Sequence, residues 1–236
     1  MSDFLSELAR FLGDSESWLG DAGLLVRTRD HLALSAFAVV AAAFLSLPPA
    51  LWLGHVGRGG TVVGAVVNIG RAIPSFGIVA LMLPISLAFG WGIGVWPTFI
   101  ALVALAMPPI FTNSYTAVTE VDRSVREAAL GMGMTGVQLM RRTELPLAMP
   151  VIWTALRIST VQVIATATLG AVVGWGGLGR YVIDGFAQGN DVFVLVGGVA
   201  VALLAIGADL LFSWGERVVL PAGTSHRDRG DLQLAG

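Results

Sequence analysis

The sequence contains no cysteine, and all fourteen of its basic residues are arginine. The lack of cysteine excludes disulfide bonds, thiolate metal ligands and cysteine-based redox chemistry. Charged residues make up only 13% of the chain, whereas about a quarter of the residues in a soluble domain are charged. With 55% hydrophobic residues and a mean hydropathy of +0.78, the 236 residues are too apolar for such a domain. A net charge of −2 argues against nucleic acid as a partner.

Catalytic sequence patterns and internal repeats are missing as well. Neither HExxH nor GxSxG occurs, and His31, His55 and His226 are expected at or beyond the ends of membrane spans. No pair of carboxylates is expected at membrane depth, so the sequence argues against an intramembrane enzyme and predicts no catalytic residue and no metal site. Because no repeat supplies internal symmetry, a symmetric solute path requires a second copy of the chain or a related subunit.

Long apolar stretches predict an all-α integral membrane protein with five spans in a membrane domain over residues 31–218. The spans cover about Leu32–Leu53, Thr61–Phe89, Val95–Val118, Leu147–Val173 and Val192–Trp214. Pro48-Pro49 is expected to kink or end the first span. The second span is interrupted by Asn68, Arg71 and Pro74-Ser75.

The two ends of the chain are polar. Residues 1–30 carry apolar side chains at helical spacing, which predicts a short interfacial helix in an extracytoplasmic segment. Acidic residues precede any apolar core there, so the segment is not expected to be a secretory signal peptide. Residues 219–236 predict a disordered cytoplasmic tail.

A polar loop of about thirty residues, Glu120–Pro150, separates the third and fourth spans. It holds eight charges: Glu120, Asp122, Glu127, Glu144, Arg123, Arg126, Arg141 and Arg142. Each would cost roughly 2.5–3.5 kcal/mol at the centre of a membrane helix, so the loop must be aqueous. A plain connector needs only a handful of residues, so a loop this long is expected to dock a partner.

The order of residues in this loop predicts two short helices joined by a turn. Strong helix formers follow Ser124, which is expected to cap the first helix. Gly131, Gly133 and Gly136 then interrupt the pattern, and Val137–Leu145 resumes it.

Arginine counts orient the chain. With the loop inside, the cytoplasmic side holds Arg58, Arg123, Arg126, Arg141, Arg142, Arg217, Arg227 and Arg229. The other side holds Arg10, Arg27, Arg29 and Arg180. Eight against four places the N-terminus outside, and the loop and the C-terminus in the cytoplasm.

The loop also resembles a known motif. Glu127-Ala128-Ala129, Gly133 and Leu145-Pro146 have the spacing of the EAA loop of bacterial ABC importer permeases, except that Thr143 stands where isoleucine is usual. The resemblance implies a type I ABC importer permease core in the bacterial cytoplasmic membrane. It assigns the contact with the ATP-binding subunit to Glu127, Ala128, Ala129, Gly133, Leu145 and Pro146.

The same resemblance implies the partners. Two copies of a cytoplasmic ATP-binding subunit would bind ATP and Mg²⁺, and this chain would bind no cofactor. A second permease subunit, either identical or paralogous, would complete the path through the lipid bilayer. A solute-binding protein outside the membrane would deliver the solute.

Polar residues and prolines within the spans are candidates for lining a solute path. They are Asn68, Pro74, Ser75, Asn113, Thr160, Gln162 and Thr166. The alternative is hydrogen bonding between helices, worth about 0.6 kcal/mol on average. Arg71 and Arg157 are expected to snorkel or to pair with an acid of a loop, and an ion pair or helix cap is favoured over ion coupling for Asp209.

A glycine-rich stretch follows the fourth span. Its external-gate candidates are Gly174, Trp175, Gly177 and Gly179. One alternative is an interfacial turn anchored by Trp175 and Tyr181, and another is a docking edge for the binding protein.

Four stretches point to one branch of these permeases. Asn68–Ser75, Asn113–Thr116, Glu127–Thr135 and Gly174–Gly179 resemble the osmoprotectant branch, which imports glycine betaine, choline, carnitine or proline betaine. Methionine-type importers share the five-span plan and remain an alternative. A secondary transporter that works without ATP is a further alternative, but it would not explain the coupling loop.

Overall fold

The computed structural model describes residues 2–72 and 74–219, without the side chains of residues 2, 3, 67–72 and 219. Every regular element within these ranges is a helix. Four helical stretches are long and apolar enough to cross a membrane. They are built on α3 (Leu24–Val56), α6 (Val95–Thr119), α9 (Leu145–Thr166) and α11 (Asp191–Val219).

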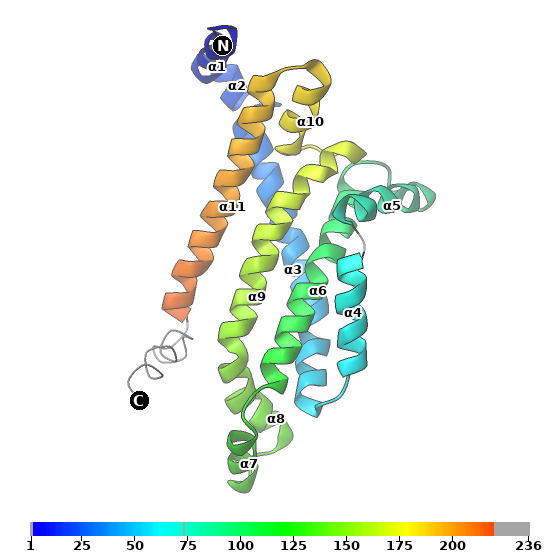
Figure 1. Cartoon of the computed structure of the whole chain (residues 1–236), viewed down its shortest axis with the longest axis vertical. Helices are drawn as coiled ribbons and strands as arrows, with labels where there is room; N and C mark the ends of the chain where they lie inside the picture. The colour runs from blue at the N-terminus through cyan, green and yellow to red at the C-terminus, as the bar shows by residue number, and fades with distance from the viewer. Residues whose placement is uncertain (1, 73, 220–236) are drawn as a thin grey trace.

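The predicted second span is divided into two half-length helices. They are α4 (Gly60–Ala72) and α5 (Ser75–Ala88), of 13 and 14 residues, whereas a span needs about twenty. Pro74 precedes α5 in an extended conformation (φ −65°, ψ 139°), so a new helix begins at Ser75. In Figure 1, α4 runs alongside α6, and α5 extends sideways away from the long helices. The two helices together return the chain from the end of α3 to the start of α6.

The first span is longer than predicted. Pro48 and Pro49 lie inside α3 and do not end it, because the helix continues to Val56 and stops at Gly57. Gly57 adopts a left-handed conformation (φ 67°), which glycine reaches without a steric penalty, and its N–H bonds the carbonyl of Gly54 at 3.2 Å.

The centre of the bundle is formed by α3, α6 and α9. Small side chains such as Ala38, Ala42 and Ala106 are buried there beside Leu102 and Val163. In a bilayer the hydrophobic effect does not drive helices together, so their association depends on van der Waals packing. Small residues favour such packing because they let the helices approach closely.

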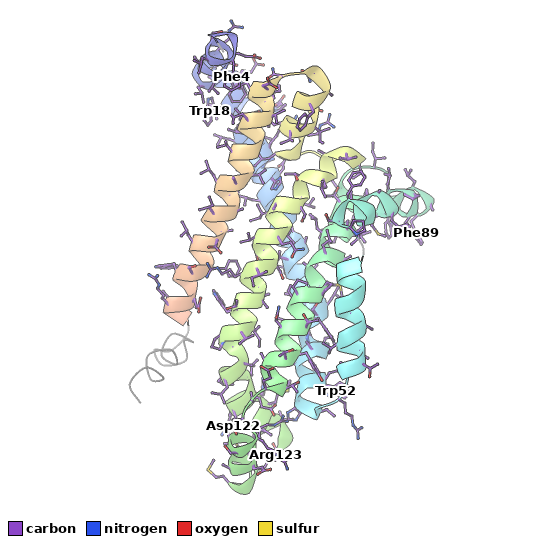
Figure 2. The ribbon with its side chains drawn as sticks, in the orientation of Figure 1. Phe4, Trp18, Trp52, Phe89, Asp122 and Arg123 are labelled. Carbon is purple, nitrogen blue, oxygen red and sulfur yellow. The ribbon has the colours of Figure 1, made fainter. Side chains whose placement is uncertain are left out.

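Helices α1 (Ser2–Gly13), α2 (Ser15–Leu19) and α10 (Gly179–Gln188) gather at the end of the bundle where the chain begins (Figure 1). The N-terminal helix was expected from its apolar spacing, whereas α10 was missed. Phe11 packs edge to face against Tyr181 and Phe193, which joins α1 to α10 and α11. The charged loop between α6 and α9 lies at the opposite end, where Figure 2 labels Asp122 and Arg123.

Candidate functional site

The charged loop folds as two short helices, as its sequence predicted. The first is α7 (Arg123–Gly131), and the second is α8 (Gly136–Leu139), followed by a π-helical turn over Met140–Glu144. Asp122 caps α7 by accepting the N–H of Ser124 at 2.8 Å, so the expectation that Ser124 is the cap was wrong. Hydrogen bonds from the Ser124 side chain and backbone hold the pKa of Asp122 below its usual value.

The turn after α7 requires glycine at position 133. Gly133 adopts φ 85°, and its N–H bonds the carbonyl of Leu130 at 2.9 Å. The next N–H, that of Met134, reaches the carbonyl of Ala129 at 3.2 Å. These two bonds form a Schellman motif, which ends a helix by satisfying its last carbonyls. The glycine of the EAA pattern therefore sets the angle between the two short helices.

The other residues of the pattern differ in exposure. Glu127 is exposed and pairs with Arg123 at 2.7 Å, and Ala128 is also exposed. Ala129 is only 3% exposed, so its side chain packs α7 against the loop and offers little surface. Leu145 and Pro146 form the first turn of α9. Pro146 has no N–H for the carbonyl one turn earlier, and a wider turn precedes it in which the N–H of Leu145 bonds Met140.

A buried charge cluster lies beneath this loop and was not predicted from the sequence. Glu144 is fully buried, with His55 Nδ1 2.5 Å from its Oε2 and Arg126 Nη2 2.9 Å from its Oε1. From the sequence, Glu144 is expected only as one of the charges that make the loop aqueous, and His55 only at or beyond the end of a span. No local pattern could reveal that these residues meet, because 89 residues separate His55 from Glu144.

Several solute-path candidates are engaged within their own helices. The Asn113 amide donates to the carbonyl of Pro109 at 2.8 Å. The hydroxyls of Thr160 and Thr166 likewise donate to carbonyls one turn earlier, at 2.8 and 2.7 Å. Such bonds satisfy a hydroxyl inside a membrane without help from a neighbouring helix.

The remaining solute-path candidates lie on other parts of the bundle. Gln162 is exposed on α9. Pro74 and Ser75 mark the start of α5, where Pro74 is exposed and Ser75 half-buried. The side chains of Asn68 and Arg71 lie outside the described residues. The described candidates thus come from α5, α6 and α9, and both α5 and α9 contact α6.

The glycine-rich stretch is packed against the bundle. Trp175 is only 6% exposed and belongs to the central core, so it does not act as an interfacial anchor. A Cβ on Gly179 would lie 2.2 Å from the carbonyl oxygen of Thr168, and one on Gly177 would lie 2.8 Å from the Trp175 ring. Gly174 is exposed at a left-handed turn (φ 88°). The four gate candidates therefore lie in a tightly packed junction between the 3₁₀ turn Ala167–Val173 and α10.

A buried histidine holds this junction to α3. His31 lies inside α3 and is fully buried, so its expected position at the end of a span was wrong. Its Nε2 bonds the carbonyl of Ile164 at 2.9 Å, which fixes Nε2 as the donor and leaves Nδ1 to accept the N–H of Leu178 at 3.3 Å. The imidazole also lies 5.7 Å from the Trp175 ring.

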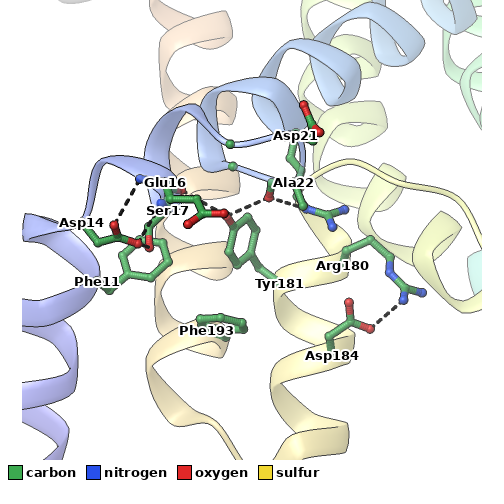
Figure 3. A pocket seen from close by; sticks show the side chains of 13 residues that line it. Phe11, Asp14, Glu16, Ser17, Asp21, Ala22, Arg180, Tyr181, Asp184 and Phe193 are labelled. Carbon is green, nitrogen blue, oxygen red and sulfur yellow. Dashed lines mark hydrogen bonds and ion pairs between the residues drawn. The ribbon is translucent and has the colours of Figure 1, made fainter.

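A pocket of about 430 Å³ lies beside this junction between α2 and α10 (Figure 3). Tyr181 forms part of its wall, and burial raises the pKa of the Tyr181 hydroxyl. The guanidinium of Arg27 lies 5.6 Å from the centre of the Tyr181 ring. Arg27 therefore already occupies the aromatic face that a cationic ligand would use.

Comparison with known proteins agrees with this geometry. The family model described as "Binding-protein-dependent transport system inner membrane component" matches residues 37–220. Choline transport system permease protein OpuBB of Bacillus subtilis is 36% identical over 85% of this chain and 90% of its own length. Osmoprotectant import permease protein OsmW of Salmonella typhimurium is 36% identical over 87% of this chain and 96% of its own.

A solved structure shows the same fold. A chain of the MetNI methionine ABC transporter, in an inward-facing conformation, superimposes with a TM-score of 0.73 at 27% identity. The match covers 84% of this chain and 97% of that one. The expected type I importer fold and the expected family are thereby confirmed. The chain belongs to the family of inner membrane components of binding-protein-dependent transport systems.

Proposed function

We propose that the chain is the membrane-spanning subunit of an ATP-driven importer of osmoprotectants such as choline, glycine betaine and carnitine. The observation that carries this proposal is the coupling loop, whose two short helices stand clear at one end of the bundle. The substrate class is supported by the names of the relatives, which are transporters of choline, of glycine betaine, carnitine and choline, and of osmoprotectants.

The loop end of the bundle is the cytoplasmic end in this proposal. There Glu127, Ala128 and Gly133 would contact the ATP-binding subunit, which binds ATP and Mg²⁺. The exposed side chain of Glu127 and the fixed turn at Gly133 support this role, because a partner needs both an accessible surface and a defined angle between helices. Leu145 and Pro146 would position the loop at the start of α9, and Ala129 would hold α7 in place.

The solute path would form between this chain and a second permease subunit, identical or paralogous. Four full-length helical stretches and one divided span leave wide apolar faces on α9 and α11. The solute-path candidates on α5, α6 and α9 would face that path in some states of the transport cycle. The junction around Trp175 and Gly179 would form the outer closure, where the binding protein delivers solute.

A methionine or other amino-acid importer is the second candidate function. The structural match to the methionine transporter favours it. The relatives named for osmoprotectants are closer in sequence, at 36% against 27% identity, and this difference supports the osmoprotectant class.

Uptake into proteoliposomes tests the proposal. The vesicles would contain this chain with its ATP-binding subunit and binding protein, and would be offered radiolabelled choline, glycine betaine, carnitine or methionine. We expect ATP-dependent uptake of the first three. ATP-dependent uptake of methionine alone would support an ATP-driven importer with a different substrate class. Uptake that does not depend on ATP would refute the proposal of an ATP-driven importer.

A pair of glycine variants tests the coupling loop in the same vesicles. Gly133→Asp places a side chain in a left-handed turn (φ 85°), whereas Gly131→Asp adds the same charge at a helical position with open space around it. We expect Gly133→Asp to abolish uptake while the binding protein still holds solute. Gly131→Asp should retain more uptake, and equal uptake by the two variants would show that the turn is not needed.

A further inference from the structure

Glu144 is a fully buried carboxylate with two cationic or potentially cationic partners. Its Oε2 lies 2.5 Å from Nδ1 of His55, and its Oε1 lies 2.9 Å from Nη2 of Arg126. The same Nη2 also donates to the carbonyl of His55 at 2.8 Å. Oε2 is hydrogen-bonded to His55, whereas Oε1 accepts no hydrogen bond and is held by the charge of Arg126 alone. A buried carboxylate is costly without ionic partners, so the three side chains are held as a unit. Arg126, Glu144 and His55 are called the latch below.

The latch joins three elements that are distant in the sequence. Arg126 lies on α7, Glu144 is the last residue before α9, and His55 belongs to the last turn of α3. Beside it, α3 meets α6 so closely that a Cβ on Gly54 would lie 2.9 Å from the Cβ of Val118. The latch therefore stands where the ends of the three central helices converge.

Helix α7 has few other attachments to the bundle. Within α7 only Ala129 is buried, and the pair between Arg123 and Glu127 is exposed to solvent. The chain itself links α7 to α6 through residues 120–122. The side chain of Arg126 adds links to α3 and to the start of α9. A displacement of α7 is therefore transmitted to α3 and α9, as well as to α6, only while Arg126, Glu144 and His55 remain in contact.

We propose that Glu144 is a positioning residue for energy coupling. Together with Arg126 and His55, it makes α7 move as one body with α3 and α9. A pull on α7 by the ATP-binding subunit then rearranges the membrane helices rather than bending the loop alone. This inference rests on the proposed importer function.

Two variants weaken the contacts among Arg126, Glu144 and His55 in different ways. Glu144→Gln keeps the shape of the side chain and removes its charge, and Arg126→Met removes the cation from the α7 side. Arg123→Met is the matched control, because it removes an arginine from the same helix whose partner is exposed. In complete transporters in proteoliposomes, the quantity to measure is solute imported per ATP hydrolysed.

We expect that ratio to fall about tenfold in both latch variants, within the range usual for coupling between two sites. The rate of ATP hydrolysis should stay within about twofold of native, because the side chain of Glu144 is fully buried and that of Arg126 is mostly buried, so neither variant removes much of the surface that α7 offers to the ATP-binding subunit. The control should keep the native ratio. The double variant should be no worse than either single variant, because the two side chains act through one contact.

The outcomes separate coupling from folding and from the choice of substrate. A native ratio in both variants overturns the inference, and so does a parallel fall of uptake and ATP hydrolysis, which marks a merely structural role. The ratio is read with whichever labelled solute the native transporter imports. A wrong substrate class therefore refutes the proposed function in the native protein and leaves the test of the latch intact.

Discussion

Arg157 on α9 and Asp209 on α11 form an ion pair with two hydrogen bonds, Nε to Oδ1 at 2.6 Å and Nη2 to Oδ2 at 2.7 Å. This geometry matches the planar guanidinium to the carboxylate, the arrangement that makes arginine pairs strong. The indole N–H of Trp153 also donates across the same two helices, to the carbonyl of Phe212 at 2.9 Å. The second half of α11, which exposes many apolar side chains, is held to α9 at these points.

Breaking this ion pair should loosen α11. We expect Asp209→Asn and Arg157→Gln each to lower the midpoint of thermal unfolding in detergent by several degrees, because each leaves a charge in an apolar region without its partner. The double variant should recover part of the loss. Arg29→Gln, which breaks an exposed pair with Asp30, should change the midpoint little. Midpoints that stay native in both single variants would show that the pair does not hold α11.

The junction at Gly179 should not tolerate even a methyl group. Gly179→Ala places a Cβ 2.2 Å from the carbonyl of Thr168, and backbone atoms cannot yield as a flexible side chain can. We expect a loss of about 1–3 kcal/mol in the free energy of unfolding, as for other overpacked sites. Gly198→Ala on α11 is the control, because nothing lies within 4 Å of its added Cβ. Denaturant titration measures both, and equal stabilities would contradict the close approach.

Replacing His31 should also destabilise this end of the bundle. His31→Phe keeps a ring of similar size but leaves the carbonyl of Ile164 and the N–H of Leu178 without their side-chain partner. A buried polar group that loses its partner costs about 1–3 kcal/mol. Hydrogen exchange at Leu178 reports the effect locally and should become faster in the variant. Unchanged exchange would mean that the imidazole does not hold the junction.

The cap of α7 should weaken in acid. The pKa of Asp122 is lowered in the folded protein, so the cap contributes its full stabilisation above the unfolded value of about 3.9. That contribution is lost as the pH falls through the lower, folded pKa. Hydrogen exchange in α7 should therefore accelerate below about pH 4.

The Asp122→Asn variant provides the control for the cap. Asparagine caps helices about as well as aspartate but does not titrate. The acid-dependent acceleration of exchange should therefore disappear in this variant. If it persists, another group is responsible for the pH dependence.

The sequence predicted the helices and the loop because their signals are local. Apolar length gave the spans, and the glycines at 131, 133 and 136 gave the turn between α7 and α8. The prolines at 48 and 49 were expected to kink or end the first span; they do not end it, since α3 packs against α6 and continues through them, and the kink stays a prediction. The complete break before Ser75 was foreseen only as an interruption.

Contacts across the bundle could not be read in this way. Nothing near Glu144 distinguishes it from Arg141 or Arg142, which remain exposed on the same loop. Its burial depends on where His55 ends up after α3 and α9 have packed. Arg157 was expected to pair with an acid of a loop, whereas its partner is Asp209 of α11, because a pattern along one helix does not give its rotation against another.

The hydrogen bonds of His31 have a consequence for how the protein is made. Its two partners, Ile164 and Leu178, lie 133 and 147 residues further along the chain. At about 5–20 residues per second of synthesis, the imidazole stays without either partner for roughly 7–30 s after it leaves the ribosome. The first span therefore enters the membrane before His31 has its hydrogen-bond partners. The packing at the N-terminal end of the bundle can form only after the fourth span, α9, and the segment that follows it have been synthesised.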